Sequence, residues 1–196
     1  MGGDTPRRRC PFDLVVVGSS WGGLSALKVI LQGLPADFDV PLAIAQHRGT
    51  ESSEVMVRLL QNHTALTVVE ASDKDSVEAG HVYIAPPDYH LLLEPGSFAL
   101  STEGVVSHSR PSIDVLFESA SDAYAERLLG VILTGANNDG SAGLRKIRNV
   151  GGVTVVQDPA TADRREMPDA AIAAVPDAKV LPLEAIAGFL AGVCGR

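Results

Sequence analysis

The strongest constraint on the fold is the regular alternation of short, β-rich apolar runs with longer segments of helical spacing. Residues 12–17 form the first apolar run, and in residues 22–34 leucine and isoleucine recur every three or four positions. Such alternation is typical of α/β proteins, in which helices connect parallel strands. We therefore predict a doubly wound, mainly parallel sheet with helices on both faces.

The same patterns place the remaining elements. We predict further strands at residues 42–45, 67–69, 82–85, 131–133 and 153–156, and further helices at residues 52–61, 112–128, 141–148, 170–174 and 183–193. Two runs joined through Pro95-Gly96, residues 91–93 and 98–100, predict a β-hairpin. The sequence has no internal repeat, so we predict a single domain at residues 12–196, preceded by a loose tail at residues 1–11.

Size, charge and cysteine content exclude several classes of protein. A chain of 196 residues can bury a core without disulfides or metal, and a net charge of −8 argues against a nucleic-acid-binding protein. Cys10 and Cys194 form no C-x-x-C pair and are expected to be reduced thiols. No apolar run approaches the ~20 residues of a membrane-spanning helix. These features predict a cytoplasmic location.

A glycine- and serine-rich turn, residues 18–23, follows the first predicted strand. Ligands bind at the carboxyl ends of parallel strands, so the turn is a candidate site, and three interpretations are open. A dinucleotide-binding loop would need glycine in place of Ser20, and an acidic residue where Gln46 and His47 stand. A nucleophile elbow, G-x-S-x-G, fits with Ser20 as the nucleophile. The third interpretation is a connection that only caps a helix.

His47 and Asp139 are the candidate partners of Ser20, because a serine nucleophile needs a base and a carboxylate that orients the base. Each follows a predicted strand, so all three residues are expected at one edge of the sheet. Taken singly, His47 fits a surface residue and Asp139 fits a turn or helix cap. Their shared position favours a catalytic triad, in a chain order that differs from the α/β-hydrolase order Ser, Asp, His.

The sequence resembles the catalytic domain of the chemotaxis protein-glutamate methylesterases, the CheB family, from about Leu14 to Val175. The motifs that carry the resemblance are Val17 to Gly23, Gln46-His47, His81 to Pro86, Arg110 to Phe117, Ile132 to Gly140, Gln157 to Ala162 and Met167-Pro168. The resemblance implies that Ser20, His47 and Asp139 form the triad. It also implies an oxyanion hole, for which backbone N–H groups near Trp21 and Ala136 are the candidates, and it implies no metal and no cofactor.

The sequence departs from the family's pattern around the expected mouth of the site. Trp21 stands where the family usually has threonine, and Ala136-Asn137 stand where it has methionine and glycine. Residues 164–166 replace a segment with an aromatic and a small residue, and Asp169 replaces a basic residue. The departures spare the triad and bear on the choice of substrate.

The resemblance implies a serine hydrolase that removes methyl esters from glutamate side chains of chemotaxis receptors, with glutamine deamidation as a related reaction. The implied partners are the cytoplasmic domains of methyl-accepting chemotaxis receptors, without nucleic acid or membrane insertion. Most members also carry an N-terminal receiver domain, for which residues 1–19 are too few, so control by a separate regulator stays open. A non-catalytic CheB-like module and an esterase or amidase with another substrate are the alternatives.

Overall fold

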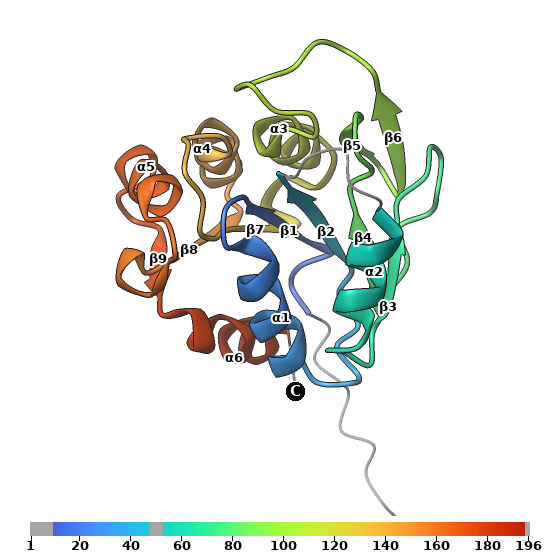
Figure 1. Ribbon diagram of the computed structural model, residues 1–196, viewed down its shortest axis with the longest axis horizontal. Coiled ribbons are helices and arrows are strands. Elements are labelled where there is room, and N and C mark those ends of the chain that lie inside the picture. The colour runs from blue at the N-terminus through green and yellow to red at the C-terminus, as the bar shows by residue number, and fades with distance from the viewer. Residues whose placement is uncertain (1–9, 48–52, 195–196) are drawn as a thin grey trace, which may run out of the picture.

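A seven-stranded parallel sheet forms the centre of the molecule in a computed structural model that describes residues 10–47 and 53–194 (Figure 1). The strand order within this part of the chain is β3-β4-β2-β1-β7-β8-β9. The bounds are β1 (Leu14–Ser19), β2 (Leu42–Gln46), β3 (Thr67–Glu70), β4 (His81–Ile84), β7 (Leu128–Ile132), β8 (Val153–Gln157) and β9 (Lys179–Leu181). From β1 the chain builds one side of the sheet through β2 and the other side through β7, so the winding direction reverses at β1.

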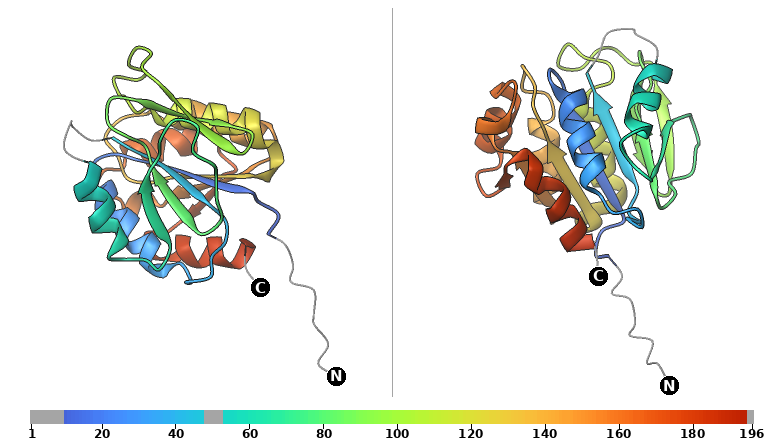
Figure 2. Two further views of the ribbon diagram at one scale, coloured as in Figure 1. Left: turned by 90° about the vertical axis from the view of Figure 1, so that its right-hand side faces the viewer. Right: turned by 60° about the horizontal axis from the view of Figure 1, so that its bottom comes forward.

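Helices cover both faces of the sheet (Figures 1 and 2). One face carries α1 (Gly23–Gly33), α2 (Ser53–Gln61) and α6 (Leu183–Cys194), and the other carries α3 (Ile113–Tyr124), α4 (Ser141–Asn149) and α5 (Glu166–Ala174). The alternation of side chains along β1 explains the two layers. Val15 and Val17 pack in the core with α1 and α6, whereas Leu14 and Val16 pack in the core with α3 and α4.

The predicted hairpin is formed by β5 (His90–Glu94) and β6 (Ser97–Ser101), which pair antiparallel outside the main sheet. Gly96 has a φ of 82°, which suits the second central residue of a Pro-Gly turn. Phe98 is fully buried, and its ring centroid lies 4.6 Å from that of Tyr83 on β4. The hairpin therefore docks onto the same face of the sheet as α3.

The predicted fold class is confirmed, and the largest differences from the predicted elements concern α3, α5 and β9. The helix predicted at residues 112–128 ends at Tyr124, and a 3₁₀ turn at Ala125–Arg127 leads into β7. Helix α5 begins at Glu166 instead of residue 170, because Pro168 in a first turn removes no helical hydrogen bond. Strand β9 was not predicted, since three residues are too few to show a period.

Other predictions fall partly outside the described residues, among them most of the tail at residues 1–11 and the predicted helix start at residue 52. A second 3₁₀ turn occupies Pro159–Thr161 after β8. Within the described part of the chain, no helix combines the length and apolar character needed to cross a membrane.

Candidate active site

The strand register places Ser20 beside His47. Ser19 pairs with Gln46 in the β1–β2 ladder, so the next residue of each strand meets at the carboxyl edge of the sheet. The His47 N–H donates to the Ser19 carbonyl oxygen at 2.9 Å, and the Ser20 N–H donates to the Thr134 carbonyl oxygen at 2.9 Å. The ends of β1, β2 and β7 are thereby joined at the point where the sequence predicted a site.

Gln46 is a buried polar residue that holds this edge together. Its Oε1 accepts a hydrogen bond from Ser19 Oγ at 2.6 Å, and its Nε2 donates to the Ser20 carbonyl oxygen at 2.8 Å and the His47 carbonyl oxygen at 2.7 Å. This hydrogen-bonding role of Gln46 was not predicted from the sequence, where Gln46 was only part of a motif. A glutamine at the end of an otherwise apolar strand is the sequence feature that could have indicated it.

The turn after β1 is shaped by its two final glycines. Gly22 has a φ of 78°, and a Cβ there would lie 2.4 Å from Asp163 Oδ2. A Cβ at Gly23 would lie 2.0 Å from Gln46 Oε1. Packing within the protein therefore explains why both positions are glycine. A dinucleotide phosphate close to the backbone is not needed to explain them.

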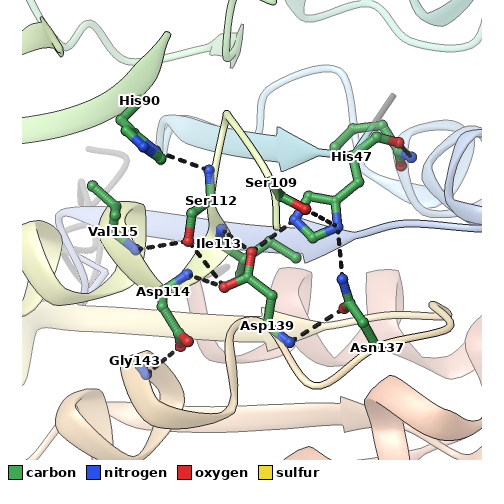
Figure 3. Close-up of polar contacts among 11 residues, drawn as sticks. His47, His90, Ser109, Ser112, Ile113, Asp114, Val115, Asn137, Asp139 and Gly143 are labelled. Carbon is green, nitrogen blue, oxygen red and sulfur yellow. Dashed lines mark hydrogen bonds and ion pairs between the residues drawn. The ribbon is translucent and has the colours of Figure 1, made fainter. Parts of the chain in front are cut away.

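His47 and Asp139 form a close pair (Figure 3). His47 Nε2 lies 2.7 Å from Asp139 Oδ2, and their side chains are 10% and 0% exposed. This is the hydrogen bond that a carboxylate needs to make in order to orient an imidazole base.

Asp139 is held at the N-terminus of α3. Its carboxylate accepts from the N–H groups of Ile113 at 2.7 Å and Asp114 at 3.0 Å, and from Ser112 Oγ at 2.9 Å. Burial alone would raise the pKa of Asp139, but the hydrogen bonds from His47 and from the two backbone N–H groups outweigh it and lower the pKa. The charged form of Asp139 is therefore favoured.

The cap role considered for Asp139 is real but belongs to another helix than the one expected. Gly140, at the N-cap of α4, has no side chain with which to cap that helix. The N-cap of α3 is Ser112, and Asp139 adds to this cap by accepting from the N–H groups of Ile113 and Asp114 in the first turn. Helix α4 is capped by Asp114, whose Oδ1 accepts from the Gly143 N–H at 2.7 Å. Burial and the nearby Asp139 carboxylate raise the pKa of Asp114 to about 6, against the hydrogen bond from Gly143.

The Ser20 hydroxyl is not hydrogen bonded to His47 within the described part of the chain. The second ring nitrogen, Nδ1, lies 3.4 Å from Ser109 Oγ and 3.3 Å from Asn137 Nδ2. A cavity of about 220 Å³ adjoins the ring, lined by His47, Asp88, Val105, His108, Ser109, Arg110 and Pro111. No role for Ser109 or Asn137 was predicted from the sequence, because both approach the ring only through tertiary structure.

The described residues contain no cluster of three or more His, Cys, Asp or Glu side chains that could hold a metal ion. The pair of His47 and Asp139 instead resembles the base and carboxylate of an acyl-transfer site.

Comparison with known proteins gives this geometry a family. Residues 15–190 match the family model described as CheB methylesterase. The chain belongs to the CheB methylesterase family. A crystal structure of the CheB methylesterase catalytic domain from Thermotoga maritima matches with a TM-score of 0.89 at 33% identity, covering 93% of this chain and 98% of that one.

Relatives of two lengths match this CheB-family chain. A Leptospira interrogans protein, provisionally named protein-glutamate methylesterase/protein-glutamine glutaminase, is 48% identical over 90% of this chain and 92% of its own length. The Myxococcus xanthus protein-glutamate methylesterase FrzG is 39% identical over 92% of this chain, which spans only 54% of FrzG.

Two departures from the CheB pattern lie side by side at the site. The Trp21 side chain is 65% exposed, and the Arg164 guanidinium lies 5.6 Å from the centre of its ring. Thr134 Oγ1 joins their backbones, since it donates to the Trp21 carbonyl oxygen at 2.9 Å and accepts from the Arg164 N–H at 2.9 Å. Trp21, the residue after Ser20, thus forms a cation–π pair with Arg164.

Proposed function

We propose that the chain is a protein-glutamate methylesterase, which hydrolyses γ-glutamyl methyl esters on chemotaxis receptors to glutamate and methanol. The observation that carries the proposal is the 2.7 Å hydrogen bond between His47 and the buried Asp139, at the sheet edge where the β1 turn presents Ser20. Membership of the CheB methylesterase family supports the same reaction.

In the proposed mechanism Ser20 is the nucleophile, His47 the general base and Asp139 the orienting carboxylate. His47 Nδ1 takes the proton of the Ser20 hydroxyl while Oγ bonds to the ester carbon. The tetrahedral intermediate then collapses, and methoxide leaves with the proton from Nδ1 as methanol. Water attacks the acyl-enzyme by the same route and gives the glutamate carboxyl group and free Ser20. An amide substrate would pass through the same acyl-enzyme, so glutamine deamidation is compatible with this site.

The proposed oxyanion hole consists of the backbone N–H groups of Trp21 and Ala136, which would donate hydrogen bonds to the oxyanion. Neither N–H takes part in a hydrogen bond within the described residues, and both residues are exposed. Trp21 directly follows Ser20, and Gly135, the residue before Ala136, lies next to Ser20, since a Cβ at Gly135 would lie 3.0 Å from Ser20 Cβ. Both N–H groups are therefore candidates to donate to a carbonyl oxygen that reacts at Ser20.

The proposed partners are the cytoplasmic domains of methyl-accepting receptors, and the proposed location is the cytoplasm. The Trp21–Arg164 pair favours a second candidate, an esterase of different specificity or a non-catalytic module, because an exposed indole beside the nucleophile changes which peptide can approach. Hydrolysis of small methyl esters without hydrolysis of receptors would favour the different esterase. A folded protein without either activity would favour the module.

The test is methanol release from methylated receptor membranes by the wild-type chain and by Ser20→Ala. We expect Ser20→Ala to lose at least ~10³-fold in kcat, because the bond to the acyl group cannot form. Ser25→Ala, on an exposed position of α1, is the matched control and should keep wild-type activity. Residual activity of more than a few per cent in Ser20→Ala would refute the serine mechanism.

A further inference from the structure

The side chain of Asn137 connects the two members of the catalytic pair (Figure 3). Its Nδ2 lies 3.3 Å from His47 Nδ1, and its Oδ1 accepts a hydrogen bond from the Asp139 N–H at 3.2 Å. Asn137 is half-buried in the loop between β7 and α4. The loop therefore contacts the imidazole on both ring nitrogens, through Asp139 at Nε2 and Asn137 at Nδ1.

The contact with Asp139 determines which end of the Asn137 amide faces the imidazole. A backbone N–H needs an oxygen acceptor, so Oδ1 points to Asp139 and the NH₂ group points to His47. An N–H that points at Nδ1 requires a lone pair on that nitrogen. The proton of the neutral ring is then on Nε2, where it is donated to Asp139.

Ser109 is compatible with either tautomer of His47. Its hydroxyl lies 3.4 Å from Nδ1 and is able to donate or accept, so it fits either tautomer. The other titratable and charged groups near the ring are Asp88, His108 and Arg110, which line the adjoining cavity. No hydrogen bond joins any of these three to the ring within the described residues. Asn137 is therefore the neighbour at Nδ1 that fits only one tautomer, which is the tautomer that the Asp139 carboxylate requires at Nε2.

We propose that Asn137 is a positioning residue that holds the Nδ1 lone pair of His47 toward the site, with the ring proton on Nε2, where Asp139 accepts it. The consequence for catalysis rests on the proposed function, in which Nδ1 takes the Ser20 proton. A contact of 3.3 Å is long for a hydrogen bond, so a serine hydroxyl can displace the amide at small cost. The N–H that faces Nδ1 can hydrogen bond only to a ring nitrogen that has a lone pair, so its loss or its replacement by an acceptor is expected to act at Nδ1.

Asn137→Asp separates this role from support of the loop. The carboxylate keeps an oxygen for the Asp139 N–H and replaces the NH₂ donor with an acceptor of nearly the same size. His47 would then lie between two carboxylates, which favours its protonated form. Asn138→Asp is the matched control, because it adds the same charge to the next residue, whose side chain is exposed.

The experiment measures the His47 ring nitrogens by ¹H–¹⁵N correlation NMR of the substrate-free protein, with His47→Gln to assign the signals. We expect the proton on Nε2 in the wild type. In Asn137→Asp, the pH at which the signals titrate and the acid limb of kcat/KM should both move up by about one pH unit. Asn138→Asp should move them by less than half as much, because solvent screens its charge.

The proposal is overturned if the wild-type proton is on Nδ1, or if Asn137→Asp moves the titration no further than Asn138→Asp. If Asn137→Asp does not fold, Asn137→Ala replaces it, with a smaller upward movement expected and no movement as the refuting result. The NMR measurement needs no substrate. A wild-type chain with the expected tautomer, together with the expected movement of the NMR titration in Asn137→Asp but without methanol release, would refute the proposed function and leave this assignment standing.

Discussion

Replacement of Asp139 by asparagine tests how the fold holds the carboxylate that we propose to be catalytic. Oδ2 accepts from His47 Nε2 and from the Ile113 N–H. Oδ1 accepts from Ser112 Oγ and from the Asp114 N–H. Because each oxygen faces a backbone donor, the NH₂ group of asparagine must point at an N–H in either orientation. The negative charge at the N-terminus of α3 is also lost.

These contacts set the size of the expected effect. A buried donor without an acceptor costs about 1–3 kcal/mol, and loss of a charge at a helix N-terminus costs about 0.3–1 kcal/mol. We expect Asp139→Asn to lower the free energy of unfolding at pH 7 by about 1–4 kcal/mol. We also expect kcat to fall by ~10³–10⁴, because an amide that faces Nε2 can favour the wrong tautomer of His47.

Urea unfolding across a range of pH measures the stability effect, and methanol release measures the catalytic one. The pKa of Asp139 is lowered in the folded protein, so its ionised form stabilises the fold above an unfolded-state pKa of about 3.9. That contribution is lost as the pH falls through the lower, folded-state pKa. The stability difference between wild type and Asp139→Asn should therefore begin to shrink as the pH falls below about 5, and should go on shrinking until the pH is below the folded-state pKa of Asp139.

Asp122→Asn provides the matched control for an aspartate on the surface. The Asp122 side chain is 71% exposed and pairs with Lys146 Nζ at 2.7 Å, so its loss should cost less than about 0.5 kcal/mol. Equal stability losses in the two variants, or a kcat of Asp139→Asn within tenfold of the wild type, would show that the reasoning about the buried carboxylate is wrong.

Two further substitutions test the surroundings of the pair. Trp21→Thr should preserve or increase methanol release from receptors. It should change the free energy of unfolding by less than about 1 kcal/mol, because the exposed indole contacts Arg164 in only a cation–π pair. A loss of activity in a folded protein would instead make Trp21 part of a changed substrate site. Asp114→Asn should raise the free energy of unfolding at pH 7 by about 1 kcal/mol after allowance for solvent screening, measured by urea unfolding. The reason is that the pKa of Asp114 is raised to about 6, so the wild type loses stability as the pH rises from about 4 through 6. If the free energies of unfolding of wild type and variant change with pH in the same way, this expectation is wrong.

The fold class was predictable because each helix and most strands show the periodicity of their apolar residues within their own short segment of the sequence. The six-residue strand β1 is buried along its whole length, and α1 buries one face, so each leaves its own period in the sequence. The position of Ser20 beside His47 also follows from local information, since residues that end neighbouring parallel strands must share an edge. Strand β9 was missed because it has only the three residues Lys179–Leu181 to show a pattern.

The surroundings of Asp139 were not predictable in the same way. A sequence pattern suggested a cap for the helix that follows it, whereas the carboxylate caps α3, whose first residues lie 26 and 25 positions earlier in the chain. The contacts of Asn137 and Ser109 with the imidazole likewise join segments 90 and 62 residues from His47. Such contacts depend on how α3 and α4 pack, and no short-range period encodes that packing.

The hydrogen-bonded pair of His47 and Asp139 spans two layers of the protein, so its geometry depends on core packing. His47 is carried by the end of β2 in the sheet, whereas Asp139 is held against α3 in the helical layer. The approach of that layer depends on Gly140, because a Cβ there would lie 2.5 Å from Ile113 Cγ2. A larger residue at position 140 would push apart the loop and the N-terminus of α3, which holds the carboxylate through Ile113. The 2.7 Å bond between His47 and Asp139 would then lengthen without a change in either residue, so part of the control over the imidazole resides in the packing of α3 against the loop before α4.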